Sequence, residues 1–278
     1  IARLIDGGSS ASGQSWLAME YVDGVDLATW VTRERPGLRR RLALFLRICD
    51  AVAFAHRSLI VHRDLKPANV LVDANDEAKL LDFGIAKLVE DDADAPTRTL
   101  VAGLTLRYAA PEQVLGDRTT TATDVYALGV VLFELIARRS PYRAADTDDA
   151  PWRDAILRGD VHALGDVLDD ALLDTADARH AASELAAVVC KAMALSPADR
   201  YSGVAALADD LQDWLDGRPF RSGLGTWSAR AGVFLRRHRV AVLAGIAVAA
   251  ALLVSSVVAL REAAEAKRQA AVAEANVD

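Results

Sequence analysis

Cysteine is scarce in this 278-residue sequence: the two, Cys49 and Cys190, lie far apart in apolar runs. That number excludes a disulfide-stapled miniprotein, and the spacing is not that of a metal site, so we expect buried thiols in a reducing compartment. A net charge of −7 argues against general affinity for nucleic acid, and we predict no nucleic-acid partner. Because 52% of residues are apolar and 26% charged, the chain is not a disordered polyelectrolyte.

Lysine is also scarce, and none precedes Lys66. No G-x-G-x-x-G motif is present: the glycine-rich stretch 7–13 lacks both that spacing and a following helix, which favours a plain hairpin connection over a phosphate-binding loop. The chain begins at Ile1 in an apolar run, with no methionine and no signal peptide. We interpret it as a fragment.

One long run without charge stands out near the other end, at residues 240–260. As a helix it would be roughly 31 Å long at about 1.5 Å per residue, close to the hydrocarbon core of about 30 Å. A buried helix of a soluble protein is the alternative, but the sharply charged flanks favour a transmembrane helix. We therefore predict a single-pass protein of the cell (inner) membrane.

The flanks of this run predict its orientation. The segment before it is basic and almost free of acids, whereas residues 261–278 are Ala-rich, helical in pattern and nearly balanced in charge. The positive-inside rule then places the bulk of the chain in the cytoplasm and the C-terminal part outside. The six arginines on the cytoplasmic side are Arg218, Arg221, Arg230, Arg236, Arg237 and Arg239.

The remaining patterns change from β to α along the chain. Apolar runs at 1–6 and 16–22 predict two strands, and runs at 70–72 and 78–81, separated by Asp73-Ala74-Asn75-Asp76, predict a hairpin. Polar residues 90–99 predict a loop. Helical periodicity covers 38–59, 122–138, 182–194 and 203–215, with a looser acidic stretch at 143–179. These patterns predict an α+β fold.

The strongest motif is HRDLKPAN at residues 62–69, followed after the predicted hairpin by DFG at 82–84. Through these residues the chain resembles the protein kinases, specifically the bacterial eukaryotic-like (Hanks-type) serine/threonine kinases. Each residue alone has an ordinary explanation, such as a turn cap or a solvated lysine, but their joint order and spacing favour the kinase fold. The resemblance extends from Met19 to about Trp214.

The resemblance implies a role for each catalytic residue in phosphoryl transfer from ATP. Asp64 would orient the substrate hydroxyl and accept its proton, and Lys66 would neutralise charge on the transferred group. Asn69 and Asp82 would bind Mg²⁺, with Mn²⁺ as a possible substitute.

A second set of residues would bind the nucleotide. Residues 19–22 resemble the hinge between the two lobes, whose backbone at Glu20 and Val22 would hydrogen-bond the adenine edge. Asp26 would bind the ribose hydroxyls, or is simply a surface carboxylate. Leu71 would form the apolar floor under adenine, or is simply a core residue.

A third set would shape the activation segment. Glu112, which ends the APE motif, would pair with Arg200, and Asp124 would anchor the catalytic loop from the helix beneath it. Thr105 would bridge Asp64 and Lys66, although Leu104 replaces the glycine that many relatives carry at that position.

Arg63 would pair with a phosphorylated loop residue, for which the candidates are Thr97 and Thr99. The alternative for both is an ordinary exposed loop threonine.

The predicted organisation is a protein-kinase fold followed by one membrane span. The phosphate-anchoring lysine and glycine-rich loop of the family have no counterpart here, so we expect this chain by itself to be inactive. The predicted partners are ATP, protein substrates and the membrane, with a homodimer possible. A pseudokinase scaffold that binds nucleotide or partners without catalysis is the alternative. The predicted parts are 1–22, small-lobe remnant; 23–219, large lobe; 220–239, juxtamembrane; 240–260, span; and 261–278, extracytoplasmic.

Overall fold

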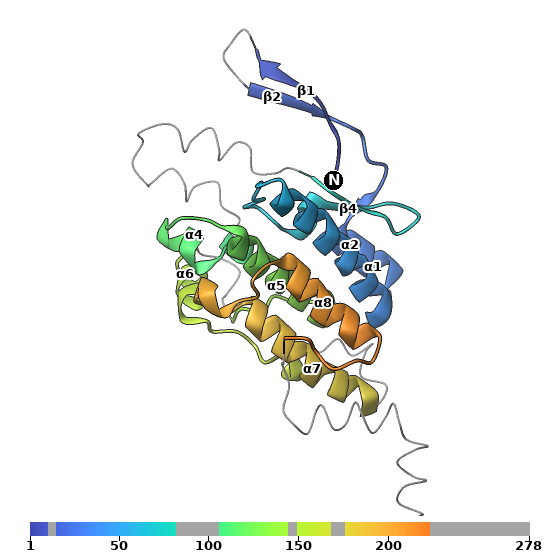
Figure 1. Cartoon of the computed structure of the whole chain (residues 1–278), viewed down its shortest axis with the longest axis vertical. Helices are drawn as coiled ribbons and strands as arrows, with labels where there is room; N and C mark the ends of the chain where they lie inside the picture. The colour runs from blue at the N-terminus through green and yellow to red at the C-terminus, as the bar shows by residue number, and fades with distance from the viewer. Residues whose placement is uncertain (11–14, 82–105, 144–148, 168–175, 223–278) are drawn as a thin grey trace, which may run out of the picture. The chain divides into compact units, whose positions relative to one another are not determined.

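A computed structural model of the chain describes residues 1–10, 15–81, 106–143, 149–167 and 176–222 (Figure 1). The chain divides into two units, Ile1–Gly225 and Thr226–Asp278, and every element below belongs to the first. The predicted span therefore lies outside the described residues, as do Asp82, Thr97, Thr99 and Thr105. Within the described part, no helix has the length and apolar character needed to cross a membrane.

The chain starts with an antiparallel hairpin of β1 (Leu4–Ser9) and β2 (Ser15–Met19), in which Leu4 pairs with Met19. β1 continues through Gly7 and Gly8, which the sequence assigned to the connection. Glycine at position 7 leaves space for the Leu17 side chain on β2, because a Cβ there would lie 2.8 Å from that side chain. The second predicted strand is shorter than expected and ends at Met19, so 20–22 is not strand.

A three-stranded sheet follows, in the order β3 (Val25–Asp26), β4 (Val70–Val72) and β5 (Ala78–Leu80), with antiparallel neighbours. The β4–β5 pair is the hairpin that the two short apolar runs predict. The Ala2 N–H donates to the Leu80 carbonyl at 2.9 Å, which ties the start of the chain to β5.

Helices form most of the described residues after β3. The sequence predicts α2, α5, α7 and α8 to within a few residues at most ends. It does not anticipate the separate short helices α1 and α4, and α6 falls inside the stretch interpreted only as loosely helical. The bounds are α1 Leu27–Glu34, α2 Leu38–Arg57, α4 Pro111–Leu115, α5 Thr121–Ala137, α6 Asp149–Arg158, α7 Ala176–Ala192 and α8 Val204–Leu215.

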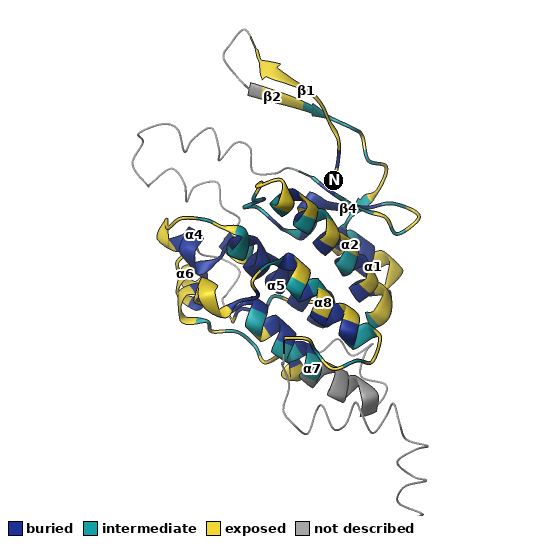
Figure 2. Ribbon diagram, in the orientation of Figure 1, coloured by how far each residue is buried: buried dark blue, intermediate teal, exposed yellow. Residues whose placement is uncertain are grey.

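Helix α5 is the centre of the hydrophobic core. Almost all of its residues are buried, and it contacts α2, α7 and α8 (Figure 2). The contact with α7 is close at Gly129, where a Cβ would lie 2.8 Å from Met193 Cγ and 2.9 Å from Ala192 Cβ. The β1–β2 hairpin, in contrast to α5, is largely exposed to solvent, and even its apolar residues Ile5 and Trp16 are exposed.

Candidate active site

The loop between α2 and β4 brings three of the predicted catalytic residues together. Lys66 Nζ lies 2.8 Å from Asp64 Oδ2, and Asn69 Nδ2 donates to the same carboxylate oxygen at 3.1 Å. Asn69 Nδ2 also donates to the Asp64 backbone carbonyl at 2.8 Å. The Asp64 carboxylate is thus held between a cation and an amide, with about a fifth of the side chain exposed.

His62 links this loop to the strand exit that leads to residue 82. Its Nε2 lies 2.9 Å from the Leu81 carbonyl, which can only accept, so Nε2 carries the proton. Nδ1 then accepts from the Asp64 N–H at 3.4 Å. Burial lowers the pKa of His62 and favours this neutral form. The sequence contains His62 in its motif but gives no sign of this bridging role.

Asp124, at the start of α5, holds the backbone of the same loop. Its Oδ2 accepts from the His62 N–H at 2.8 Å and its Oδ1 from the Arg63 N–H at 2.9 Å. His56 Nε2 lies 2.7 Å from Oδ2. Arg63 has a φ of 67°, a conformation that costs free energy in a non-glycine residue. The buried carboxylate of Asp124 helps to hold that conformation, which the sequence does not predict, whereas contact between Asp124 and the loop backbone is expected from the sequence.

Glu112 and Arg200 form a buried bidentate ion pair with two N–O distances of 2.7 Å. Arg200 donates in addition to three backbone carbonyls, at Ala122, Ala194 and Leu195. Thr123 Oγ1 donates to Glu112 Oε1 at 2.8 Å. The predicted pair is present, and it fastens α4 to the loop before α8.

Gln113 is a contact that the sequence does not reveal. Its Nε2 donates to the Arg63 carbonyl at 2.9 Å, and its Oε1 accepts from the Ala110 N–H at 3.0 Å. A second unanticipated contact is the 2.8 Å hydrogen bond from Tyr108 OH to Glu134 Oε2. These contacts join residues 108–113 to the loop that carries Asp64 and to α5.

Comparison with known proteins agrees with this geometry. The protein kinase domain family matches residues 2–212. This chain belongs to the protein kinase family. The kinase PknB of Mycobacterium tuberculosis is 35% identical over 205 residues, which cover 73% of this chain and 31% of that protein.

Two further relatives are also described as serine/threonine-protein kinases. PknB of Mycobacterium leprae is 32% identical over 76% of this chain and 32% of its own length. A probable serine/threonine-protein kinase of Streptomyces coelicolor, SCO3848, is 33% identical over 73% of this chain and 29% of its own length. The chain therefore spans about a third of the length of the curated relatives it matches.

The residues predicted to bind the nucleotide lie between β2 and α1 and on β4, and two of them make other contacts. Glu20 follows β2, and its side chain pairs with Lys79 at 3.0 Å. Val22 lies in the connection to β3. Leu71 is half-buried on β4, on the face opposite buried Val70 and Val72, and its role as the adenine floor stays a prediction.

Asp26 has a structural contact that the sequence did not reveal. It is the N-cap of α1, accepting from the Thr29 N–H at 2.9 Å and from Thr29 Oγ1 at 2.6 Å. This contact matches the surface-carboxylate alternative more closely than the ribose role, which stays a prediction.

Asn69, a predicted metal ligand, has its amide oxygen available. Both contacts of the Asn69 amide nitrogen go to Asp64, and among the described residues no donor reaches the Asn69 amide oxygen, the kind of ligand that Mg²⁺ takes. The Asn69 carbonyl accepts from the Leu81 N–H at 2.8 Å, immediately before Asp82. Asn69 therefore fits the metal role.

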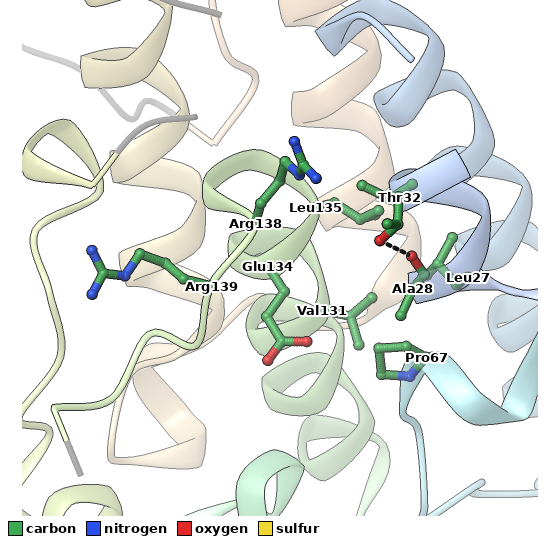
Figure 3. A pocket seen from close by; sticks show the side chains of 10 residues that line it. Leu27, Ala28, Thr32, Pro67, Val131, Glu134, Leu135, Arg138 and Arg139 are labelled. Atoms are coloured by element: carbon green, nitrogen blue, oxygen red, sulfur yellow. Dashed lines mark hydrogen bonds between the residues drawn. The ribbon is translucent and has the colours of Figure 1, made fainter. Parts of the chain in front are cut away.

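A pocket of about 260 Å³ lies beside the catalytic loop, between α1 and α5 (Figure 3). Pro67, which follows Lys66 directly, forms part of its wall together with Val131 and Glu134. Burial raises the pKa of the Glu134 carboxyl, and the hydrogen bond from Tyr108 only partly offsets this.

Proposed function

We propose that this chain is the catalytic part of a serine/threonine protein kinase, which transfers the γ-phosphoryl group of ATP to serine or threonine hydroxyls of proteins. The observation that carries the proposal is the convergence of Lys66 and Asn69 on the Asp64 carboxylate. A scaffold without catalysis has no chemical need for this arrangement. The enzyme is therefore favoured over a pseudokinase.

In this mechanism Asp64 provides the carboxylate that orients the incoming hydroxyl and accepts its proton. Asn69 and the backbone contacts of His62 and Asp124 fix the carboxylate in position, which supplies the orientation on which phosphoryl transfer depends. Lys66, 2.8 Å from Asp64, stabilises negative charge that develops on the transferred group.

The metal and the nucleotide would be bound by residues on both sides of this centre. Asn69 and Asp82 would hold Mg²⁺, or Mn²⁺ in its place, and the ion would neutralise phosphate charge when bound. Glu20, Val22, Asp26 and Leu71 would surround the nucleoside. Thr105 would contact Asp64 and Lys66 from the activation segment.

The wider setting is proposed from the sequence. One membrane span at 240–260 would anchor the kinase region on the cytoplasmic side, where it would meet its protein substrates. Phosphorylation of Thr97 or Thr99 would order the activation segment through Arg63. A homodimer is a further hypothesis, which protein cross-linking would test.

The test is the substitution Asp64→Asn in the full-length protein. It removes the proton-accepting carboxylate but keeps a side chain of the same size and leaves the metal residues, so we expect phosphoryl transfer to fall at least about a thousandfold. ATP affinity should change by no more than a few-fold. Transfer of radiolabelled phosphate to a generic basic protein and nucleotide binding are measured side by side.

The matched control is Asp117→Asn, an identical chemical change at an exposed position after α4. It should leave transfer and ATP affinity at the level of the unchanged protein. Undiminished transfer by the Asp64→Asn protein would show that Asp64 is not the residue that accepts the proton.

A further inference from the structure

Helix α8, the last helix of the described residues, carries Asp209, Asp210 and Asp213, and its C-cap is Asp216; we call these four residues the acidic face of α8. Two of these carboxylates are almost inaccessible: Asp210 is 0% exposed and Asp213 is 2% exposed. Isolated buried carboxylates are strongly unfavourable, so partners have to compensate them.

The partners come largely from the segment Arg218–Ser222, which we call the strap. Arg218 Nε lies 2.9 Å from Asp213 Oδ1, and Arg221 Nε lies 3.2 Å from Asp213 Oδ2. Each arginine reaches a second carboxylate as well, Arg218 that of Asp216 at 2.8 Å and Arg221 that of Asp209 at 3.2 Å. The strap therefore lies along the acidic face of α8.

Ser222 closes the strap on the other buried carboxylate. Its N–H donates to Asp210 Oδ1 at 3.1 Å, and its hydroxyl donates to Asp210 Oδ2. Tyr201 OH also donates to Oδ2, at 2.9 Å. Of the three hydrogen bonds that described residues donate to the Asp210 carboxylate, two come from Ser222, which is itself exposed to solvent.

We propose that the strap is a charge-operated latch on α8, which opens when Ser222 carries a phosphoryl group. A phosphorylated Oγ has no hydrogen to donate to Asp210, and it brings about −1.5 to −2 charges against a buried carboxylate. The phosphate would also compete with Asp209 and Asp213 for Arg221. All three effects weaken the contact between the strap and α8 and favour release of the strap.

Only the source of the phosphoryl group rests on the proposed function. In the transfer, Ser222 Oγ would form a bond to the γ-phosphorus of ATP while the bond to the bridging oxygen breaks. ADP leaves, and the hydroxyl proton passes to the catalytic carboxylate of the kinase molecule that acts. Opening of the latch can be tested without any such activity.

The experiment installs phosphoserine at position 222 during protein synthesis and measures amide hydrogen exchange of the full chain in detergent micelles. Exchange in the peptide that contains the strap should accelerate about tenfold or more relative to the unmodified chain. Phosphoserine at Ser196, an exposed loop position outside the strap, is the matched control and should leave strap exchange unchanged.

A second variant separates charge from the lost hydroxyl. Ser222→Ala removes the hydroxyl hydrogen bond to Asp210 but keeps the N–H donor and adds no charge, so its strap should exchange faster than the unmodified strap but clearly more slowly than the phosphoserine strap. Unchanged exchange with phosphoserine at 222 would overturn the latch. Equal acceleration in Ser222→Ala and phosphoserine 222 would overturn its operation by charge.

Discussion

The guanidinium of Arg200 makes five hydrogen bonds, two to Glu112 and three to backbone carbonyls, although the residue is 4% exposed. Its charge is thus fully compensated inside the protein. Burial by itself would raise the pKa of Glu112, but the hydrogen bonds and charge of Arg200 outweigh it and hold the pKa below its usual value. Ionised Glu112 is therefore a stabilising group.

At the residue scale we predict that Glu112→Gln lowers the free energy of unfolding of the kinase region by about 3–5 kcal/mol at pH 7, because Arg200 is left buried without its counter-charge. An acid whose folded pKa is lowered stabilises above its unfolded pKa of about 4.3, and that contribution is lost as pH falls through the folded value. The variant should therefore lose part of its acid sensitivity below about pH 4.3. Chemical denaturation followed by tryptophan fluorescence from pH 7 to 3 measures both effects.

The control is Glu134→Gln, because the pKa of Glu134 is shifted in the opposite direction to that of Glu112. The folded pKa of Glu134 is raised by burial, so ionisation of this group costs stability as pH rises from about 4.3 through the folded pKa. Glu134→Gln keeps an oxygen acceptor for Tyr108 and should not destabilise at pH 7. Equal losses in the two variants would show that the argument from charge compensation is wrong.

At the scale of elements, α5 positions the site because it is fixed on several sides at once. Asp124 near its first turn holds the catalytic loop, and Glu134 near its last turn accepts from Tyr108. Between them, Gly129 allows α7 to approach closely. The packing of this helix is thus connected to the geometry of the loop that carries Asp64.

We predict that Gly129→Ala destabilises the kinase region by about 1–3 kcal/mol, although alanine has the higher helix propensity by about 1 kcal/mol. The new Cβ would meet Ala192 Cβ at 2.9 Å and Met193 Cγ at 2.8 Å, and the backbones would have to separate. Thermal unfolding measures the change. Gly165→Ala, where no atom lies within 4 Å of the added Cβ, should stay within about 0.5 kcal/mol of the unchanged protein. A higher melting temperature for Gly129→Ala would contradict the close-packing argument.

Long periodic elements and the catalytic motif were readable in the sequence, but short elements and tertiary contacts were not. Helix α2 has 20 residues and a clear apolar face, whereas α1 has only eight and follows its N-cap Asp26, a residue with an equally good functional interpretation. Strand β1 includes Gly7 and Gly8 because backbone hydrogen bonding to β2 needs no side chain at these positions. The contacts of His62 and Gln113 depend on loop geometry that no local pattern encodes.

At the scale of the whole molecule, the strap gives part of the basic segment before the predicted span a structural role in addition to its predicted membrane-flanking role. Arg218 and Arg221, counted by the sequence among the membrane-flanking charges, lie against acids of α8 in the described structure. The remaining four arginines of the segment, and the span itself, lie outside the described residues. Membrane anchoring therefore stays a prediction from the sequence.

The predicted orientation follows from six arginines before the run 240–260 against Arg261, Lys267 and Arg268 after it. Acidic residues contribute little to the positive-inside rule, so pairing of Arg218 and Arg221 with α8 does not remove them from the count made during insertion. Protease added to intact spheroplasts should spare the kinase region and cut only beyond residue 260. Detergent-permeabilised spheroplasts are the control, in which the polar residues 90–99, predicted from the sequence to be a loop, should also become accessible. Cleavage between residues 82 and 105 without permeabilisation would mean that the kinase region faces outward, away from cytoplasmic ATP.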